Sequence, residues 1–337
     1  RTIKKVASHI FIDGFGGMTQ GLFATLIIGT MIQQIGLLIG GSTGNVIYLL
    51  GKAAAALTSA GIGVGVAVKY GESPLVTVSA AVAAMVGGYA GKITGGTFFV
   101  DGNAVLAGPG EPLGAFIAAF AGITCGHLVS GKTKVDIIVT PVITIGAGSV
   151  VGLLVGPPIS QMMTGLGSII NWATEQRPFI MGIVVSVVMG MVLTLPISSA
   201  ALGIILNLSG LAAGAATIGC CCNMVGFAVA SYRENKFGGL VAQGLGTSML
   251  QVPNIMRHPL IWLPVIFSSA ILGPVSTILA NMQNNATGSG MGSAGLVGQI
   301  TTYQTVIADD DPKLVIIKII LRHSVLAAVI TLFFSEV

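Results

Sequence analysis

Long apolar stretches run through the whole chain, separated by short segments rich in glycine and polar residues. A membrane-crossing helix needs about 20 consecutive, mostly apolar residues. The sequence therefore predicts an all-α integral membrane fold with about ten transmembrane helices. The predicted crossings are residues 17–40, 46–69, 74–92, 112–130, 135–156, 178–206, 211–232, 259–281 and 313–335, with a weaker one at 294–307.

Three apolar but turn-rich stretches between the crossings are too short to span a bilayer: residues 101–111, 237–254 and 284–298. Each is dense in Gly, Asn, Pro or Gln. In lipid, such a backbone persists only where it is buried in protein or lines a cavity. We expect re-entrant hairpins or broken helices at these places.

Residues 158–175 have a different pattern. Their apolar residues recur at helical spacing, and Trp172 lies near the end of the segment. This pattern is typical of an amphipathic helix lying in the membrane interface, with the tryptophan at the level of the headgroups.

The two sides of this segment resemble each other. Gly21 corresponds to Gly182 at an offset of 161, and residues 64–68 correspond to 225–229; later the offset grows, and 74–76 match 259–261. The matches are either chance similarity in Gly/Ala-rich sequence or an internal duplication, as in many transporters. The duplication predicts a first repeat at 1–157, a linker helix at 158–177 and a second repeat at 178–337. The second repeat carries an inserted hairpin near 235–257. Whether the repeats are parallel or inverted stays open.

Composition supports the membrane prediction. Of the residues, 53% are hydrophobic and only 8% are charged, and the mean hydropathy is +0.92. A soluble domain carries about 25% charged residues. The net charge of +4 is too weak and too scattered for a nucleic-acid partner. Arg1, Lys4 and Lys5 form a positive flank that favours a cytoplasmic N-terminus.

The four cysteines, Cys125 and Cys220 to Cys222, have neither the spacing of a zinc site nor the context of a disulfide framework. No metal or cofactor is predicted. No catalytic triad or carboxylate pair stands out, so we predict no self-sufficient catalytic site. His127, near the end of a crossing and close to Lys132 and Lys134, favours a surface role.

The most informative candidate site is the run from Gly108 to Gly114, in which Gly110, Glu111 and Pro112 combine a carboxylate with helix-breaking residues. A carboxylate in an apolar, turn-forming stretch is costly and usually serves a substrate or a pathway. Freed backbone groups and a carboxylate acceptor suit the hydroxyls of a polar solute. The alternative is a loop-tip glutamate in water. Ser293 occupies the corresponding place in the second half.

Other polar residues at predicted membrane depth are either interhelical hydrogen-bonding groups or further solute contacts. Several of them cluster in the helix breaks and in the inserted hairpin. The candidate substrate-binding residues among them are Ser198, Asn223, Gln251, Asn254 and Gln299.

At these residues the sequence resembles a known family. The Glu-Pro pair in a re-entrant setting is similar to the motif of the membrane IIC components of the bacterial phosphoenolpyruvate-dependent sugar phosphotransferase system. Further runs resemble its type 2 branch, which includes the perfringolysin-regulator-like (PfoR-like) proteins. These runs are Lys132 to Val139, Leu195 to Ala200, Gly244 to Leu250 with Pro253 and Asn254, and Gly290 to Gln299.

The resemblance implies a multi-pass, homodimeric protein of the bacterial inner membrane, in which the hairpin glutamate contacts a sugar and a separate IIB domain phosphorylates it. The chain shows no soluble IIA or IIB stretch, so phosphorylation would need partner proteins. Its Gly-Pro-Gly-Glu-Pro sequence also departs from the Gly-Ile-Thr-Glu-Pro of the glucose-type branch, so the substrate does not carry over.

These observations rank three functions. The first is an IIC-like permease for a sugar or a related polar solute. The second is an ion-coupled secondary transporter with Glu111 as proton carrier, and the third is a membrane regulator that binds solute without transporting it.

Overall fold

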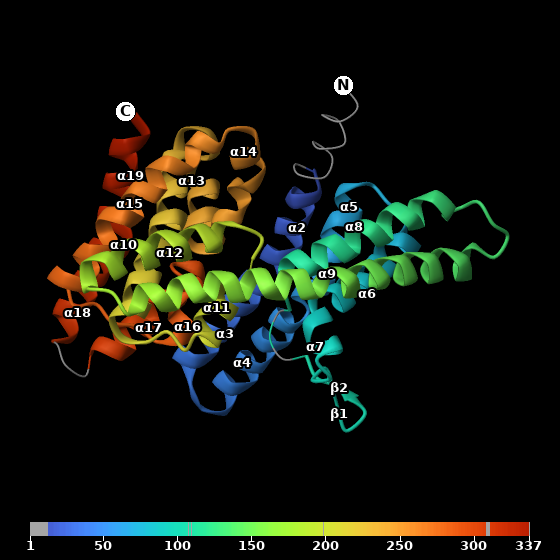
Figure 1. The fold of residues 1–337 in the computed structure, drawn as a ribbon, viewed down its shortest axis with the longest axis horizontal. Helices are drawn as coiled ribbons and strands as arrows, with labels where there is room; N and C mark the ends of the chain where they lie inside the picture. Colours follow the sequence, from blue (N-terminus) through green and yellow to red (C-terminus); the bar gives the residue numbers. More distant parts are fainter. Residues whose placement is uncertain (1–12, 107, 109, 198, 308–310, 337) are drawn as a thin grey trace. The chain divides into compact units, whose positions relative to one another are not determined.

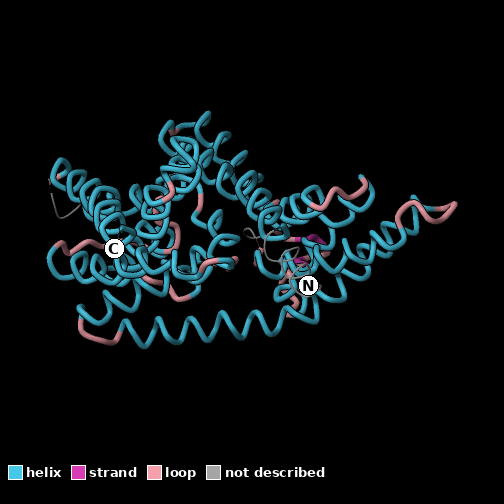
Figure 2. Tube along the Cα trace, turned by 90° about the horizontal axis from the view of Figure 1, so that it is seen from above, coloured by secondary structure: helices cyan, strands magenta, loops and turns pink. Residues whose placement is uncertain are grey.

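The computed structural model describes residues 13–336 except 107, 109, 198 and 308–310. Almost all of the described chain is helical, as Figure 2 shows, with one short pair of strands. The chain divides into two compact units, which meet between Met162 and Met163. This boundary falls within the linker that the sequence predicts at 158–177. The units are described in turn.

The first unit consists of helices and a small hairpin (Figure 1). Its elements are α2 (Phe15–Leu22), the π-helical η2 (Phe23–Ile27), α3 (Ile28–Ile39), α4 (Gly41–Ala56), α5 (Thr58–Lys69), α6 (Pro74–Gly88), α7 (Ala90–Thr94), β1 (Phe99–Val100), β2 (Asn103–Ala104), α8 (Pro112–Val129) and the start of α9 (Asp136–Thr174).

Glycines set the helix packing in this unit. Helices α2 and α5 run antiparallel, with Gly17 beside Gly65 and Gly21 beside Gly61. A Cβ atom added at Gly21 would meet the carbonyl group of Gly61. Small residues let backbones approach this closely, which is a common way to pack helices in membranes. Helices α6 and α8 approach each other in the same way at Gly87 and Gly114.

The second unit surrounds one buried helix, α12. Its elements are the end of α9, α10 (Pro178–Thr194), α11 (Ser199–Ile205), α12 (Gly210–Ala230), α13 (Tyr232–Val241), η3 (Ala242–Gly246), η4 (Ser248–Gln251), α14 (Val252–Arg257), η5 (Pro259–Trp262), α15 (Leu263–Pro274), η6 (Val275–Leu279), α16 (Ala286–Ser289), η7 (Ala294–Leu296), α17 (Val297–Val306), α18 (Pro312–Ile319), η8 (Ile320–Leu326) and α19 (Ala327–Glu336). Of the most apolar 18-residue window in α12, 89% is buried.

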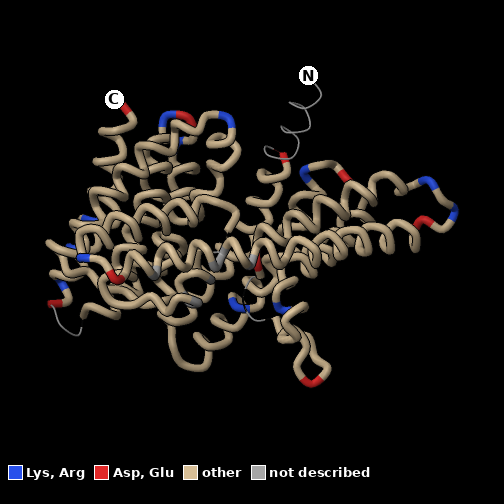
Figure 3. The backbone as a smooth tube through the Cα atoms, in the orientation of Figure 1, with Lys and Arg blue, Asp and Glu red and all other residues tan. Residues whose placement is uncertain are grey.

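Six helices of the described chain are long and apolar enough to cross a membrane, and a seventh crossing results if α4 and α5, bent by 53°, form one broken span. Helices α6 and α10 are apolar but shorter. Outward-facing side chains such as Ile137 and Leu154 are 73% and 70% exposed. Figure 3 shows that the charged residues lie mainly at turns and chain ends. The protein is therefore a multi-pass membrane protein, and the number of ten crossings stays a prediction.

Several predicted boundaries change. The crossing predicted at 178–206 is two helices, α10 and α11, because the run from Leu195 to Ile197 breaks the helix. The weaker crossing at 294–307 is only the ten-residue α17. The stretch at 101–111 begins in an exposed β-hairpin, with Val100 opposite Asn103. A re-entrant path for this stretch stays a prediction.

The crossing predicted at 135–156 and the separate helix predicted at 158–175 form one continuous helix, α9. Pro157 and Pro158 lie inside this helix, although each proline removes an intrahelical hydrogen bond. Only the carbonyl groups of Leu153 and Leu154 lose their usual donors at these positions, and the helix continues on both sides. An interfacial location for residues 158–175 stays a prediction.

Candidate solute-binding sites

Glu111 lies directly before α8, at a turn between two helices of the first unit. Its backbone N–H donates to the Gly88 carbonyl at the end of α6 (2.7 Å), and its own carbonyl accepts from Ala115 one turn into α8 (3.0 Å). Pro112 is the first residue of the helix, where its missing N–H matters least. The residue is half-buried. The carboxylate therefore sits at the positive end of an 18-residue helix.

Gly110 makes this turn possible. Its φ of +77° lies in the left-handed region, and a Cβ atom there would meet the Ser59 hydroxyl group and the Gly88 carbonyl. The buried Tyr89 also contacts the segment, because its hydroxyl donates to the Gly108 carbonyl and to Ala56 O (3.4 Å). The turn is thus held against α5 and α6 by backbone and hydroxyl groups.

A second group of predicted residues lies in the second unit, around Asn223 in the middle of α12. This side chain is fully buried. Its Oδ1 accepts hydrogen bonds from Thr194 Oγ1 (3.1 Å) and Trp262 Nε1 (3.2 Å). Its Nδ2 donates to Gly219 O (3.1 Å) and Ser269 Oγ (3.3 Å). Asn223 thereby connects α10, α15 and η5 through one amide group.

The inserted hairpin contributes a chain of amides that reaches α12. Asn254 Nδ2 donates to Gln251 Oε1, Gln251 Nε2 donates to Gln243 Oε1, and Gln243 Nε2 donates to Ser231 Oγ, each at 2.8 Å. Gln243 and Gln251 are buried. The chain holds the irregular segment at 242–254 against the end of α12.

The other irregular segment, at 284–296, lies beside this one. Ser293 Oγ donates to Gly244 O (2.5 Å) and is buried. Gln299, at the start of α17, donates through Nε2 to Cys221 Sγ (3.8 Å). Its Oε1 is buried and has no hydrogen-bond partner within the described residues. In the two segments predicted as re-entrant or broken in the second half, the parts at 242–253 and 284–296 are thus irregular and in contact with each other.

The structure therefore brings together Asn223, Gln251, Asn254, Ser293 and Gln299 within the second unit, whereas Gly110, Glu111 and Pro112 lie in the first. Ser198 lies outside the described residues.

Sequence reasoning missed four polar groups of the second unit. Thr194 and Ser248 share a hydrogen bond of 2.8 Å beside Asn223, and Trp262 donates to the same amide. Asn284 donates to Thr217 Oγ1 (2.7 Å) and to Gly298 O (3.1 Å). Asn284 stands at the edge of a predicted turn-rich segment, which could have marked it. Thr194 and Ser248 carry no comparable signal, since Thr and Ser are common in membrane helices.

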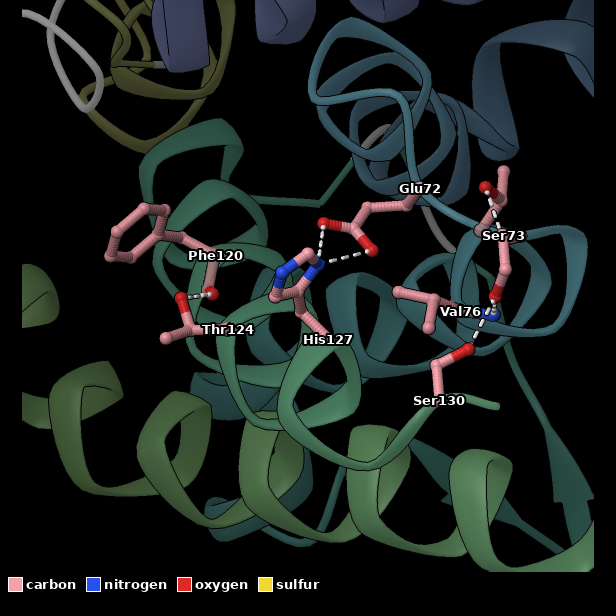
Figure 4. Close-up of polar contacts among 8 residues, drawn as sticks. Glu72, Ser73, Val76, Phe120, Thr124, His127 and Ser130 are labelled. Carbon is pink, nitrogen blue, oxygen red and sulfur yellow. Dashed lines mark hydrogen bonds and ion pairs between the residues drawn. The ribbon is translucent and has the colours of Figure 1, made fainter. Parts of the chain in front are cut away.

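His127 takes part in a separate polar contact at the end of α8 (Figure 4). Its Nδ1 lies 3.0 Å from Glu72 Oε1, in the turn between α5 and α6. The His127 side chain is 69% exposed. Beside this pair, Ser73 and Ser130 share a hydrogen bond of 2.9 Å. The pair joins two neighbouring turns at the surface of the first unit.

No curated protein matches the chain. A family model does match it, over residues 12–337, which is nearly its full length. That family is described as the phosphotransferase system EIIC family. Its members are the membrane permease components of a sugar phosphotransferase system, a role that implies a sugar substrate and IIA and IIB partners. The glycine-packed membrane helices and the Glu-Pro turn fit such a role, and the chain belongs to the phosphotransferase system EIIC family.

Proposed function

We propose that this protein binds a sugar or a related small polar solute and translocates it, and that separate IIA and IIB proteins carry out the phosphorylation. The observation that carries the proposal is the position of Glu111, a half-buried carboxylate residue at an irregular turn that opens a membrane-length helix. The family membership supplies the class of substrate.

The chemistry of this turn suits a polyol. An ionised carboxylate is an acceptor with two oxygen atoms, and sugar hydroxyls are donors. Hydrogen bonds to a charged acceptor are stronger than those between neutral groups. Gly110 allows the turn to pack against Ser59 and Gly88, and Pro112 fixes the direction in which α8 leaves the turn.

The second unit contains neutral amide and hydroxyl side chains that also suit a polar solute. We propose that Gln251, Asn254, Ser293, Gln299 and Asn223 supply further contacts or hold the irregular segments that do so. Gln299 is the best of these, because its buried Oε1 has no partner among the described residues and can accept a hydrogen bond from a sugar hydroxyl. Ser198 is proposed on its sequence position alone, in the helix break after α10.

We further propose that the protein is a homodimer of the bacterial inner membrane, of the type 2 branch, with its N-terminus in the cytoplasm. The start of α2 lies beside the end of α5, because a Cβ atom at Gly14 would meet the Tyr70 side chain. The hydrogen-bonded pairs of Figure 4 join this end to the loop that carries Lys132 and Lys134. Basic residues at one end of the unit favour the cytoplasmic side.

The experiment that tests the site is equilibrium binding to the purified protein, using a panel of hexoses, pentoses, hexitols and disaccharides. For the sugar that wild type binds best, we expect Glu111→Gln to weaken binding by about 1.5–3 kcal/mol, the loss typical of a hydrogen bond to a charged group. Asp101→Asn is the matched control, because it removes a carboxylate from the exposed hairpin tip ten residues earlier.

Unchanged affinity of the Glu111→Gln protein contradicts the assignment of this residue. Failure of wild type to bind any sugar of the panel contradicts the substrate class. A loss of the same size in Asp101→Asn would mean that overall charge, and not the turn, governs binding.

A further inference from the structure

The last span of the chain carries two ionisable side chains close to its centre. The candidate span is Pro312–Glu336, and Arg322 and His323 lie near its middle. Ionisable residues at this depth are costly, and they usually face a pathway, a cavity or a bound group. Neither residue belongs to the sites described above.

The imidazole of His323 is buried and has an unmade hydrogen bond. The residue is 1% exposed, and its Nδ1 has no hydrogen-bond partner within the described residues. The Ser276 hydroxyl on the neighbouring helix is in the same state, at 1% exposure. Buried polar atoms without a partner are rare, and an internal water molecule is the usual explanation.

His323 and Ser276 lie at the same level of a packed helix pair. Helices α15 and α19 run antiparallel, since Leu272 shares an apolar cluster with Ala327 and the rings of Phe267 and Phe334 lie 5.3 Å apart. Ser276 lies four residues, or about one helical turn, after Leu272. His323 lies four residues before Ala327, at the corresponding level of the other helix. Both face the same seam, beside α12.

A second, independent feature marks the same level. Ser276 lies in the π-helical segment η6 (Val275–Leu279), and His323 lies in the π-helical segment η8 (Ile320–Leu326). A π-turn widens the helix and changes the pattern of backbone hydrogen bonds, and such turns are frequent at functional sites. Two of them thus carry polar atoms without partners into one seam.

We propose that His323 and Ser276 hold internal water at the middle of the last span, and that His323 is a proton-binding site there. A proton that arrives from bulk solvent through this water converts the imidazole to imidazolium and leaves by the same route, so the water itself is unchanged. The ligand is thus water and its proton, and the site is distinct from the proposed sugar-binding residues. It does not depend on Glu111.

The charged and titratable groups around this site come from few elements. Helix α12 carries only the thiols of Cys220, Cys221 and Cys222, and α15 with η6 carries none. Helix α18 carries Lys313 and Lys318, and the His323 helix itself carries Arg322 and Glu336. No carboxylate lies on α12, α15 or α18, so the proton reaches the imidazole from bulk solvent through the internal water and not from a neighbouring acid.

Solid-state NMR of the full chain in lipid bilayers tests the proposal, using protein labelled with ¹⁵N-histidine. The variant His9→Asn/His127→Asn/His258→Asn leaves His323 as the single histidine, so its signal needs no mutation at the site. We expect magnetisation to pass from water protons to the His323 ring as readily as to the exposed His127 ring in wild type. We also expect the ring signal to shift from the neutral to the protonated form as the pH is lowered.

Ser276→Ala, made in the same background, should slow the transfer from water, because it removes the second polar group of the seam. Ser335→Ala, on an exposed serine at the end of the same span, should leave it unchanged. Absence of water transfer to His323 overturns the proposal, and so does a ring that keeps one protonation state across the whole range in which the bilayer sample is stable.

Discussion

Gly110 holds the turn before α8 in a backbone conformation that a residue with a side chain adopts only at a cost. Its φ is +77°, and a Cβ atom would also meet Ser59 and Gly88. Gly102, at the tip of the exposed hairpin, has an equally positive φ of +78° but nothing within 4 Å. Substitution of either glycine therefore carries the same conformational cost, and only substitution of Gly110 adds a steric clash.

We predict that Gly110→Ala weakens solute binding and lowers thermal stability, because the side chain pushes the Glu111 turn away from α6. Gly102→Ala should cost only the left-handed term, about 1–2 kcal/mol, with binding intact. Binding isotherms and thermal unfolding in detergent measure both effects. Equal behaviour of the two variants would show that the turn does not need its contact with α6.

Asn223 is the residue on which the polar core of the second unit depends. We predict that Asn223→Ala destabilises this unit by about 1–3 kcal/mol for each buried donor left without an acceptor. Trp262→Phe removes one such donor while keeping most of the ring.

A double-mutant cycle separates the two contributions. If the hydrogen bond of 3.2 Å is the main link between them, Trp262→Phe should cost less in the Asn223→Ala background than in wild type. Additive losses of stability would contradict a direct coupling.

At the scale of residues, the sequence indicated which polar side chains are unusual, but not which groups they form hydrogen bonds with. Glu111 and Asn223 stand out because a carboxylate and an amide are conspicuous in apolar stretches. Thr194 and Trp262, which bond to Asn223, could not be found, because the chain folds them together from positions 29 and 39 residues away. Nothing in local spacing encodes such a contact.

At the scale of elements, the packing of α2 on α5 depends most clearly on individual glycines. Gly21 lies against the backbone of Gly61, whereas Gly16 on the same helix has only the Lys69 side chain at 3.9 Å. We predict that Gly21→Ala separates the helices and lowers the thermal stability of the first unit.

Gly16→Ala is the control on the same helix. It should be neutral or slightly stabilising, by about 0.5–1 kcal/mol, since alanine favours helix over glycine. Thermal unfolding of both variants in detergent decides the matter. A Gly21→Ala protein as stable as wild type would show that the helices can separate without loss.

The helix pairs bear on the predicted duplication. Helices α5 and α6 pair antiparallel, as do α12 and α15. The sequence aligns 64–68 in α5 with 225–229 in α12, and 74–76 at the start of α6 with 259–261 in η5, directly before α15. At the start of each half the arrangements differ. Helix α2 runs antiparallel to α5, whereas α10 runs parallel to α12, with Ser186 beside Gly219 and Thr194 bonded to Asn223. The duplication stays a prediction.

The length of the apolar stretches predicted where helices occur, but not where each helix ends. The crossing predicted at 135–156 and the helix predicted at 158–175 are one helix, α9, which runs through Pro157 and Pro158. The run at 195–197 is a break, as Pro196 indicates: Leu195, directly before the proline, is extended (φ −72°, ψ 159°) and ends α10. The presence of a proline alone therefore does not decide where a helix ends.

For the whole molecule, family membership and the outward apolar side chains agree on a multi-pass permease component. The membrane class follows from composition alone, since 8% charged residues cannot cover a water-facing surface. The substrate does not follow from composition, because the few side chains that contact a solute determine which solute binds. The coupling of transport to phosphorylation by partner proteins stays a proposal.

Uptake into liposomes containing the purified protein tests the central claim most directly. With IIA and IIB proteins and a phosphoryl donor inside the vesicles, we predict that a labelled sugar is taken up and recovered as its phosphate, and that Glu111→Gln greatly reduces this uptake. Uptake of unmodified sugar driven by a pH gradient alone, with no phosphotransferase protein present, would contradict the account and identify an ion-coupled transporter instead.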